Sequence, residues 1–234
     1  EGGSAVTGSG NILTGATTGI YAVTVDLDGC AKSVTNINVV GHPNPDYTIS
    51  GGGSYCAGST KPNVVITFTE GQTPWDIVYN NGTGNVTQND VTSPYTITAA
   101  NAGTYTLVSL KDDYGCSGTV SAAKSALVTE VAQPTTTLQT TDLDYCGTVS
   151  DVTLTVAPFT PATYQWKNGA ATVGGNSNSF ANATAGTYSV TLTNGICTYT
   201  LNNITVTQLD KPTYSFSGGG TVCQGSTPNS VILT

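Results

Sequence analysis

The residues best suited to chemistry in this chain of 234 residues are its six cysteines and a few aspartates. His42 is the only histidine and no Cys-x-x-Cys motif occurs, which disfavours a zinc site built from cysteine and histidine. Cysteines without metal-ligand spacing instead indicate disulfides and an oxidising compartment. We therefore expect the chain to bind no metal and no other cofactor.

The acidic residues offer little for catalysis. Asp26 with Asp28, and Asp112 with Asp113, each lie just before a glycine and are interpreted as polar turns. Calcium requires about six to eight oxygen ligands, more than two turn carboxylates supply, although the sequence leaves calcium binding open. Glutamates occur only at positions 1, 70 and 130, and a Ser–His–Asp system could use only His42. The sequence thus predicts no catalytic residue and no enzyme.

The charge pattern excludes several kinds of partner. Only 9% of the residues are charged, the formal net charge is −8, and six lysines are present without any arginine. Nucleic acids and anionic membrane surfaces are bound through clustered lysine and arginine, which this chain lacks. No run of 18 apolar residues occurs, so no membrane-spanning segment is predicted.

An internal repeat is the strongest signal in the sequence. The segment 45–60 recurs as 212–227, and the segment 19–30 recurs as 186–197. The offset is 167 residues in both cases, as the spacing from Cys56 to Cys223 and from Cys30 to Cys197 shows. Two separate anchors with one offset indicate a tandem repeat.

A shorter repeat divides this period into two domains. The Ala-Gly-Thr-Tyr sequence at 102–105 returns at 185–188, and each copy precedes an alternating apolar segment, a turn and a cysteine. Prolines stand near the proposed joints and stiffen them. The sequence therefore predicts part of a domain at 1–43, complete domains at 44–132 and 133–210, and the beginning of a further domain at 211–234.

The complete domains are expected to be all-β. Short alternating apolar segments are separated by Asn, Gly and Asp turns, and no segment has the pattern of an amphipathic helix. The strands expected in the first domain are 64–68, 75–79, 95–97, 105–110 and 126–131, and those in the second follow the same order. Short strands at this spacing, with a tryptophan on the third strand, indicate tandem immunoglobulin-like β-sandwiches arranged as an extended array.

Five aromatic residues are assigned structural roles in these sandwiches. Tyr21, Tyr105 and Tyr188 each follow a Gly-x pair, where immunoglobulin-like folds place a tyrosine whose hydroxyl bonds the backbone. Trp75 and Trp166 lie at alternating strand positions and are expected in the core. The alternative for all five is a ligand-binding ring, which for the tryptophans means stacking on a carbohydrate.

The cysteines are expected to pair within domains. We predict that Cys56 bonds Cys116 and that Cys146 bonds Cys197, because each pair joins the start and the end of one proposed domain. A closed loop of about 60 residues stabilises a domain by roughly 4 kcal/mol in the chain-entropy model. Cys30 and Cys223 are expected to have their partners in the missing parts of the truncated domains.

Several short motifs resemble those of a known group of proteins. They are Tyr-Cys-Ala-Gly-Ser at 55–59, Val-Cys-Gln-Gly-Ser at 222–226, Tyr-Gln-Trp at 164–166, Tyr-Gly-Cys at 114–116 and the two Ala-Gly-Thr-Tyr segments. The chain resembles, over nearly its whole length, the immunoglobulin-like repeats of very large Bacteroidota surface proteins such as gliding-motility adhesins of the SprB type. That resemblance implies type IX secretion and a role in adhesion or gliding, but it supplies no binding residues.

The leading hypothesis is therefore a structural stalk segment of an extracellular filament or adhesin at the cell surface. Its expected partners are the neighbouring repeats of the same chain, with surface glycans or the secretion and gliding machinery as further partners. One alternative is a glycan-binding array that uses exposed tyrosines such as Tyr79, Tyr114 or Tyr145. Another is an accessory array of a secreted hydrolase whose catalytic domain lies elsewhere.

Overall fold

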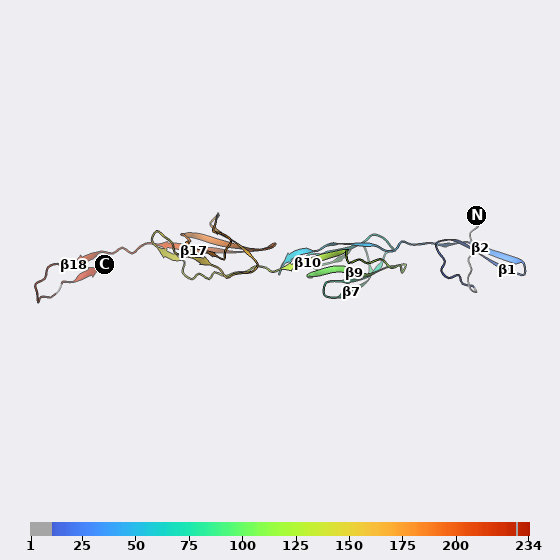
Figure 1. Cartoon of the computed structure of the whole chain (residues 1–234), viewed down its shortest axis with the longest axis horizontal. Coiled ribbons are helices and arrows are strands. Elements are labelled where there is room, and N and C mark those ends of the chain that lie inside the picture. The colour runs from blue at the N-terminus through green and yellow to red at the C-terminus, as the bar shows by residue number, and fades with distance from the viewer. Residues whose placement is uncertain (1–10, 228) are drawn as a thin grey trace. The chain divides into compact units, whose positions relative to one another are not determined.

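The computed structural model describes residues 11–227 and 229–234. Every regular element in these residues is a β-strand, which confirms the all-β prediction. No helix in the described part of the chain is long and apolar enough to cross a membrane. Two sandwiches, each built from two sheets, account for most of the strands (Figure 1).

The first sandwich contains eight strands. They are β3 (Tyr47–Gly51), β4 (Gly53–Cys56), β5 (Val64–Phe68), β6 (Trp75–Asn80), β7 (Asn85–Val91), β8 (Tyr95–Ile97), β9 (Gly103–Asp112) and β10 (Ser125–Val131). One sheet has the order β3-β5-β8 and the other the order β4-β10-β9-β6-β7. This division of strands between two sheets is that of an immunoglobulin-like sandwich.

The core of the first sandwich follows from the alternation of its strands. Val64, Ile66 and Phe68 of β5 are buried while the residues between them are less so. Trp75 of β6 stacks on Phe68, with ring centroids 4.7 Å apart. Because successive side chains of a strand point to opposite faces, one face of each sheet supplies this core.

The second sandwich repeats the arrangement with shorter outer strands. Its strands are β11 (Asp144–Cys146), β12 (Leu154–Thr155), β13 (Thr163–Asn168), β14 (Ala171–Val173), β15 (Ser179–Phe180), β16 (Gly186–Asn194) and β17 (Cys197–Leu209). One sheet pairs β12 with β15, and the other has the order β11-β17-β16-β13-β14. The order β4-β10-β9-β6-β7 of the first sandwich therefore has a direct counterpart here.

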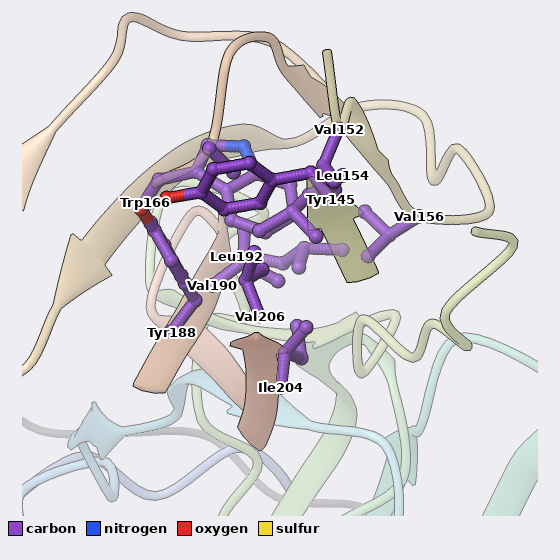
Figure 2. Close-up of a cluster of buried hydrophobic side chains, with 11 residues drawn as sticks. Tyr145, Val152, Leu154, Val156, Trp166, Tyr188, Val190, Leu192, Ile204 and Val206 are labelled. Carbon is purple, nitrogen blue, oxygen red and sulfur yellow. The ribbon is translucent and has the colours of Figure 1, made fainter. Parts of the chain in front are cut away.

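Trp166 on β13 lies within the core of the second sandwich (Figure 2). Its side chain is fully buried, and its indole N–H donates a hydrogen bond to the carbonyl of Ser177 at 2.9 Å. Val190 and Leu192 on β16, and Ile204 on β17, pack into the same cluster. The indole thus buries a large apolar surface without leaving its polar atom unsatisfied.

Two hairpins stand outside the sandwiches. The first pairs β1 (Gly19–Leu27) with β2 (Cys30–Val39), and the second pairs β18 (Phe216–Gly218) with β19 (Val231–Leu233). Large apolar residues are exposed on both hairpins, including Val23, Val25, Phe216 and Val231.

The described chain forms two compact units. Among the described residues, the first consists of 11–53 and Lys61–Thr129, and the second of Ser54–Thr60 together with 130–227 and 229–234. Segment 54–60, which follows Gly53 directly in the chain, thus belongs to the second unit. This membership brings one cysteine of the first sandwich's sheet, Cys56, into the second unit.

Candidate functional site

The disulfide of this chain joins Cys56 to Cys197, across 141 residues of sequence. Cys116 and Cys146 are both unpaired, so the predicted pairs Cys56–Cys116 and Cys146–Cys197 are wrong. Cys56 ends β4 of the first sandwich, and Cys197 begins β17 of the second. The bond therefore connects strands of two successive sandwiches rather than two strands of one.

The length of β17 explains why the predicted bond within the second sandwich cannot form. Cys146 stands opposite Leu209 at the end of β17, whereas Cys197 is the first residue of that strand. Twelve residues of strand separate these positions by about 40 Å. A disulfide requires α-carbons within about 7 Å, so this pair is excluded.

Hydrogen bonds surround the disulfide within the second unit. The amide of Ala57 donates to the carbonyl of Val131 at 2.8 Å, and the sulfur of Cys197 lies 3.7 Å from the same oxygen. The side chain of Asn194 donates to the carbonyl of Ala132 at 2.9 Å. We use the name "joint" for the disulfide and these partners: Cys56, Ala57, Val131, Ala132, Gln133, Asn194, Cys197 and Thr198.

The backbone of the joint is held in place residue by residue. Gln133 extends the pattern, because its side-chain amide donates to the carbonyl of Thr198 at 2.7 Å. Three consecutive residues, from Val131 to Gln133, thus contact the β16–β17 hairpin or the disulfide. Pro134 follows directly and has no N–H that would need a partner. Sequence reasoning missed Val131, Gln133 and Asn194, since nothing in a single sequence distinguishes them from other joint and turn residues.

All three predicted corner tyrosines bond the backbone four residues upstream. The hydroxyl of Tyr21 donates to Thr17 at 2.7 Å, that of Tyr105 to Asn101 at 3.0 Å, and that of Tyr188 to Thr184 at 2.9 Å. Tyr105 and Tyr188 are buried. Burial raises the pKa of Tyr105, and the hydrogen bond to Asn101 opposes that rise. Each of these hydroxyls donates to a backbone carbonyl, and the side chains of Tyr105 and Tyr188 are buried in their sandwiches.

The two tryptophans are also buried. Trp75 is 8% exposed and Trp166 is fully buried, so neither indole face is free to stack on a sugar. The indole N–H of Trp75 is a buried polar side-chain group without a hydrogen-bond partner among the described residues.

The tyrosines considered for glycan binding are mostly inaccessible. Tyr79 and Tyr145 are each only 7% exposed, so the expectation that they are surface rings is wrong. Burial, followed by the neighbouring Tyr95, raises the pKa of Tyr79 to about 12. Tyr114 is 54% exposed, and its ring stacks on His42 with centroids 3.8 Å apart. The only histidine is therefore held by a ring contact at the start of the first sandwich.

Backbone amides donate to one carboxylate in each acidic turn. Asp112 is buried and accepts hydrogen bonds from the amides of Cys116 at 2.8 Å and Gln72 at 3.2 Å. Asp26 accepts one from the amide of Gly29 at 3.0 Å. No group of three or more metal-ligating side chains occurs in the described ranges. The shallow pocket beside Asp112 has a volume of about 170 Å³, below the roughly 300 Å³ at which small-molecule sites begin.

Comparison with known families supports the immunoglobulin-like assignment for the first sandwich. Residues 56–126 match the family model of the immunoglobulin-like domain of nucleoporin POM152. A search of curated proteins finds no significant match. Neither comparison indicates an enzyme family.

One solved structure extends the likeness over most of the chain. A mutated fragment of titin with three immunoglobulin domains has a TM-score of 0.54 and 10% identity, with 82% of this chain and 75% of the titin chain covered. Sidekick-1 domains 1–5 have a TM-score of 0.45 and 11% identity, with 86% and 48% covered. The four N-terminal domains of Dscam1 have a TM-score of 0.35 and 16% identity, with 78% and 51% covered. The titin match and the sheet order define a chain of tandem immunoglobulin-like β-sandwiches.

Proposed function

We propose that this chain is a segment of an extracellular stalk in which successive immunoglobulin-like sandwiches are linked covalently. The observation that carries the proposal is the Cys56–Cys197 disulfide, which joins β4 of one sandwich to β17 of the next. A stalk must transmit force along its length without unfolding. A covalent bond placed between successive domains serves that purpose directly.

The disulfide supplies a short path for tension. A force applied at the two ends of the chain passes from Cys56 to Cys197 through the sulfur atoms. The residues between these two cysteines, which include β5 to β16, then carry no load. They cannot be extended until the disulfide is reduced, so both sandwiches are protected from mechanical unfolding over most of their length.

The terminal hairpins support the idea of a longer array. Val23 and Val25 are 49% and 64% exposed, whereas their counterparts 167 residues later, Val190 and Leu192, are fully buried. Val231 is 68% exposed, and its counterpart Val64 is fully buried. We infer that segments 1–43 and 211–234 belong to further sandwiches whose other strands cover these apolar faces. Residues 1–10 of the first segment lie outside the described residues.

The setting and the partners follow from the same features. A stable disulfide favours an oxidising extracellular location, and the low density of charge suits a surface that binds little. The partners in this proposal are the neighbouring repeats of the same chain. Display at the cell surface, type IX secretion, and a use in adhesion or gliding with the corresponding machinery or surface glycans rest on the resemblance to the giant surface proteins.

Single-molecule pulling of the chain from both ends tests the stalk function. In the oxidised chain, the loop closed by the disulfide should stay hidden at every force below that which breaks covalent bonds. Reduction should then release about 50 nm of additional contour length, from 141 residues at about 3.5 Å each. Full extension of the oxidised chain would contradict the proposal.

Glycan binding is the competing function from the sequence. Of the three tyrosines considered for it, only Tyr114 is exposed. Binding of the chain to a glycan array, lost in Tyr114→Ala, would favour that function over a stalk. The accessory array of a hydrolase would be supported by a catalytic domain in the same gene.

A further inference from the structure

Four cysteines of this chain are unpaired, and each occupies a position equivalent to one of the two that are bonded. We use the name "N-terminal cysteines" for those at the first strands of a sandwich: Cys56, Cys146 and Cys223. We use the name "hairpin cysteines" for those at the last hairpin of a sandwich: Cys30, Cys116 and Cys197. The observed disulfide joins one member of each group.

Cys30 has the same backbone setting as Cys197. In the β1–β2 hairpin Leu27 stands opposite Cys30, and in the β16–β17 hairpin Asn194 stands opposite Cys197. Both hairpins carry a register shift just after the corner tyrosine. The bonded cysteine and the unpaired one therefore lie at the same place in the same hairpin.

Cys223 has the same setting as Cys56. The amide of Ser59 donates to the carbonyl of Cys56 at 2.8 Å, and the amide of Ser226 donates to that of Cys223 at 3.0 Å. The three glycines before each cysteine have matching positive φ angles, for example 76° at both Gly52 and Gly219. The turn that presents Cys56 is thus already formed at Cys223.

Cys146 and Cys116 match across the shorter repeat. Cys146 ends β11 as Cys56 ends β4, and each follows a buried tyrosine. The carbonyl of Cys116 accepts a hydrogen bond of 3.1 Å from Asp112, the last residue of β9. Cys197 stands opposite Asn194, the last residue of β16.

At the start of the first sandwich, the turn that contains Cys116 contacts the segment before the sandwich, as the β16–β17 hairpin contacts Val131. His42 and Val131 occupy equivalent positions. Val39 pairs with the first residue of β1, and Val128 pairs with the first residue of β9. His42 and Val131 each follow these residues by three positions. Val131 contacts Cys197 of the next hairpin, and His42 stacks on Tyr114, two residues before Cys116. Cys116 thus lies where an N-terminal cysteine of a preceding sandwich would reach it.

We propose that every boundary between successive sandwiches of the array carries this disulfide. Cys30 and Cys116 bond the N-terminal cysteine of the sandwich before their own, and Cys146 and Cys223 bond the hairpin cysteine of the sandwich after their own. Each bond forms when two thiols lose two protons and two electrons to a disulfide oxidant, which is reduced to two thiols. The inference rests on the proposed array.

The bonds overlap along the chain. The loop closed by Cys56 and Cys197 contains Cys146, whose own bond reaches into the following period. Every complete sandwich therefore takes part in two bonds, one with each neighbour, and lies mostly inside a closed loop. A stalk built in this way resists extension at every boundary rather than at alternate ones.

One additional period makes the proposal testable. Residues 44–210 form one 167-residue period, so a second copy of them inserted after Asp210 preserves the order of the array. The extended chain is refolded with reduced and oxidised glutathione, and free thiols are counted after denaturation without reductant. We expect the count to stay at the four of the present chain, because Cys146 of the first copy bonds Cys116 of the second. A rise by two free thiols would overturn the proposal.

Peptide mapping under non-reducing conditions identifies the new bond. Cys116→Ser in the second copy should release the thiol of Cys146 in the first copy, whereas Cys116→Ser in the first copy should leave all disulfides in place. Recovery of Cys56–Cys197 from both copies shows that the sandwiches have folded. Bonds of Cys56 to Cys116, or of Cys146 to Cys197, would contradict the proposal.

A second measurement uses the protein from its natural source. In non-reducing digests, the peptide with Cys30 should be linked to a cysteine that lies outside residues 1–234. A free thiol at Cys30 would overturn the proposal. In the pulling experiment with the present chain, the hidden length depends on the Cys56–Cys197 bond alone. That experiment can therefore support the stalk function even if the further disulfides are absent.

Discussion

Cys56 at the end of β4 and Cys197 at the start of β17 form a disulfide, although they belong to strands of two different sandwiches. The carbonyl of Val131 lies beside both halves of this link, as the acceptor for Ala57 and the neighbour of the Cys197 sulfur. The disulfide and the last residue of the first sandwich thus form one structure.

Removal of the disulfide should destabilise the chain measurably. Cys56→Ser with Cys197→Ser should lower the free energy of unfolding by about 4–5 kcal/mol in the chain-entropy model, because the unfolded chain gains the entropy of the opened loop. Urea denaturation followed by circular dichroism measures the change. The matched control is Cys30→Ser with Cys223→Ser, two exposed and unpaired positions that should shift the transition little. Equal effects in both variants would contradict the assignment.

Gly52 should not tolerate a side chain. Its φ is +76°, and an added β-carbon would lie 2.6 Å from the carbonyl oxygen of Leu127. Gly58 has a similar φ of +83° with nothing within 4 Å of the same position. Gly58→Ala should cost about 1 kcal/mol for the left-handed backbone, and Gly52→Ala clearly more, because backbone must also move. Thermal unfolding compares the two, and similar melting temperatures would argue against the close approach of Gly52 to β10.

The corner hydroxyls should matter only where they are buried. Tyr188→Phe removes a part-buried hydrogen bond between a buried side chain and the carbonyl of Thr184, and should cost about 1 kcal/mol. Tyr21→Phe removes the equivalent bond to Thr17 at an exposed site, where water replaces it, and should cost much less. Denaturant titration measures both variants. A Tyr21→Phe effect as large as that of Tyr188→Phe would contradict this account.

Alkaline pH should weaken the first sandwich through Tyr79. Tyrosine ionises near pH 10 in an unfolded chain, whereas the pKa of Tyr79 in the folded chain is about 12. Between these values the folded chain holds the proton more tightly, so stability is intact below about pH 10 and falls as the pH rises toward 12. Tyr79→Phe should reduce that fall in urea titrations at successive pH values. A dependence unchanged in Tyr79→Phe would show that this hydroxyl ionises freely.

Much of the fold could be predicted because it depends on local pattern. The segments Val64–Phe68 and Tyr95–Ile97 are rich in β-branched and aromatic residues, and both are strands with the predicted bounds. The polar segment Asn85–Val91 was not predicted, because an outer strand such as β7 has little apolar alternation to reveal it. Tyr79 lies four residues after Trp75 on β6, so strand alternation places both on the buried face, and this pattern argues against Tyr79 as a surface ring.

The cysteine pairing could not be predicted for a related reason. The 167-residue offset identifies Cys56 with Cys223 and Cys30 with Cys197, but it is equally compatible with bonds inside a sandwich and between sandwiches. The choice is made by the length of β17, which holds Cys146 far from Cys197, and by the approach of Val131 to the β16–β17 hairpin. These are relationships of tertiary structure.

Disulfide mapping of the oxidised 234-residue chain tests the central claim most directly. After alkylation of free thiols and digestion without reductant, the account predicts one cross-linked species, in which the peptide with Cys56 is joined to the peptide with Cys197. Cys30, Cys116, Cys146 and Cys223 should be recovered alkylated. Recovery of Cys56 joined to Cys116, together with Cys146 joined to Cys197, would contradict the account, because each sandwich would then be closed on itself and the stalk would have no covalent joint.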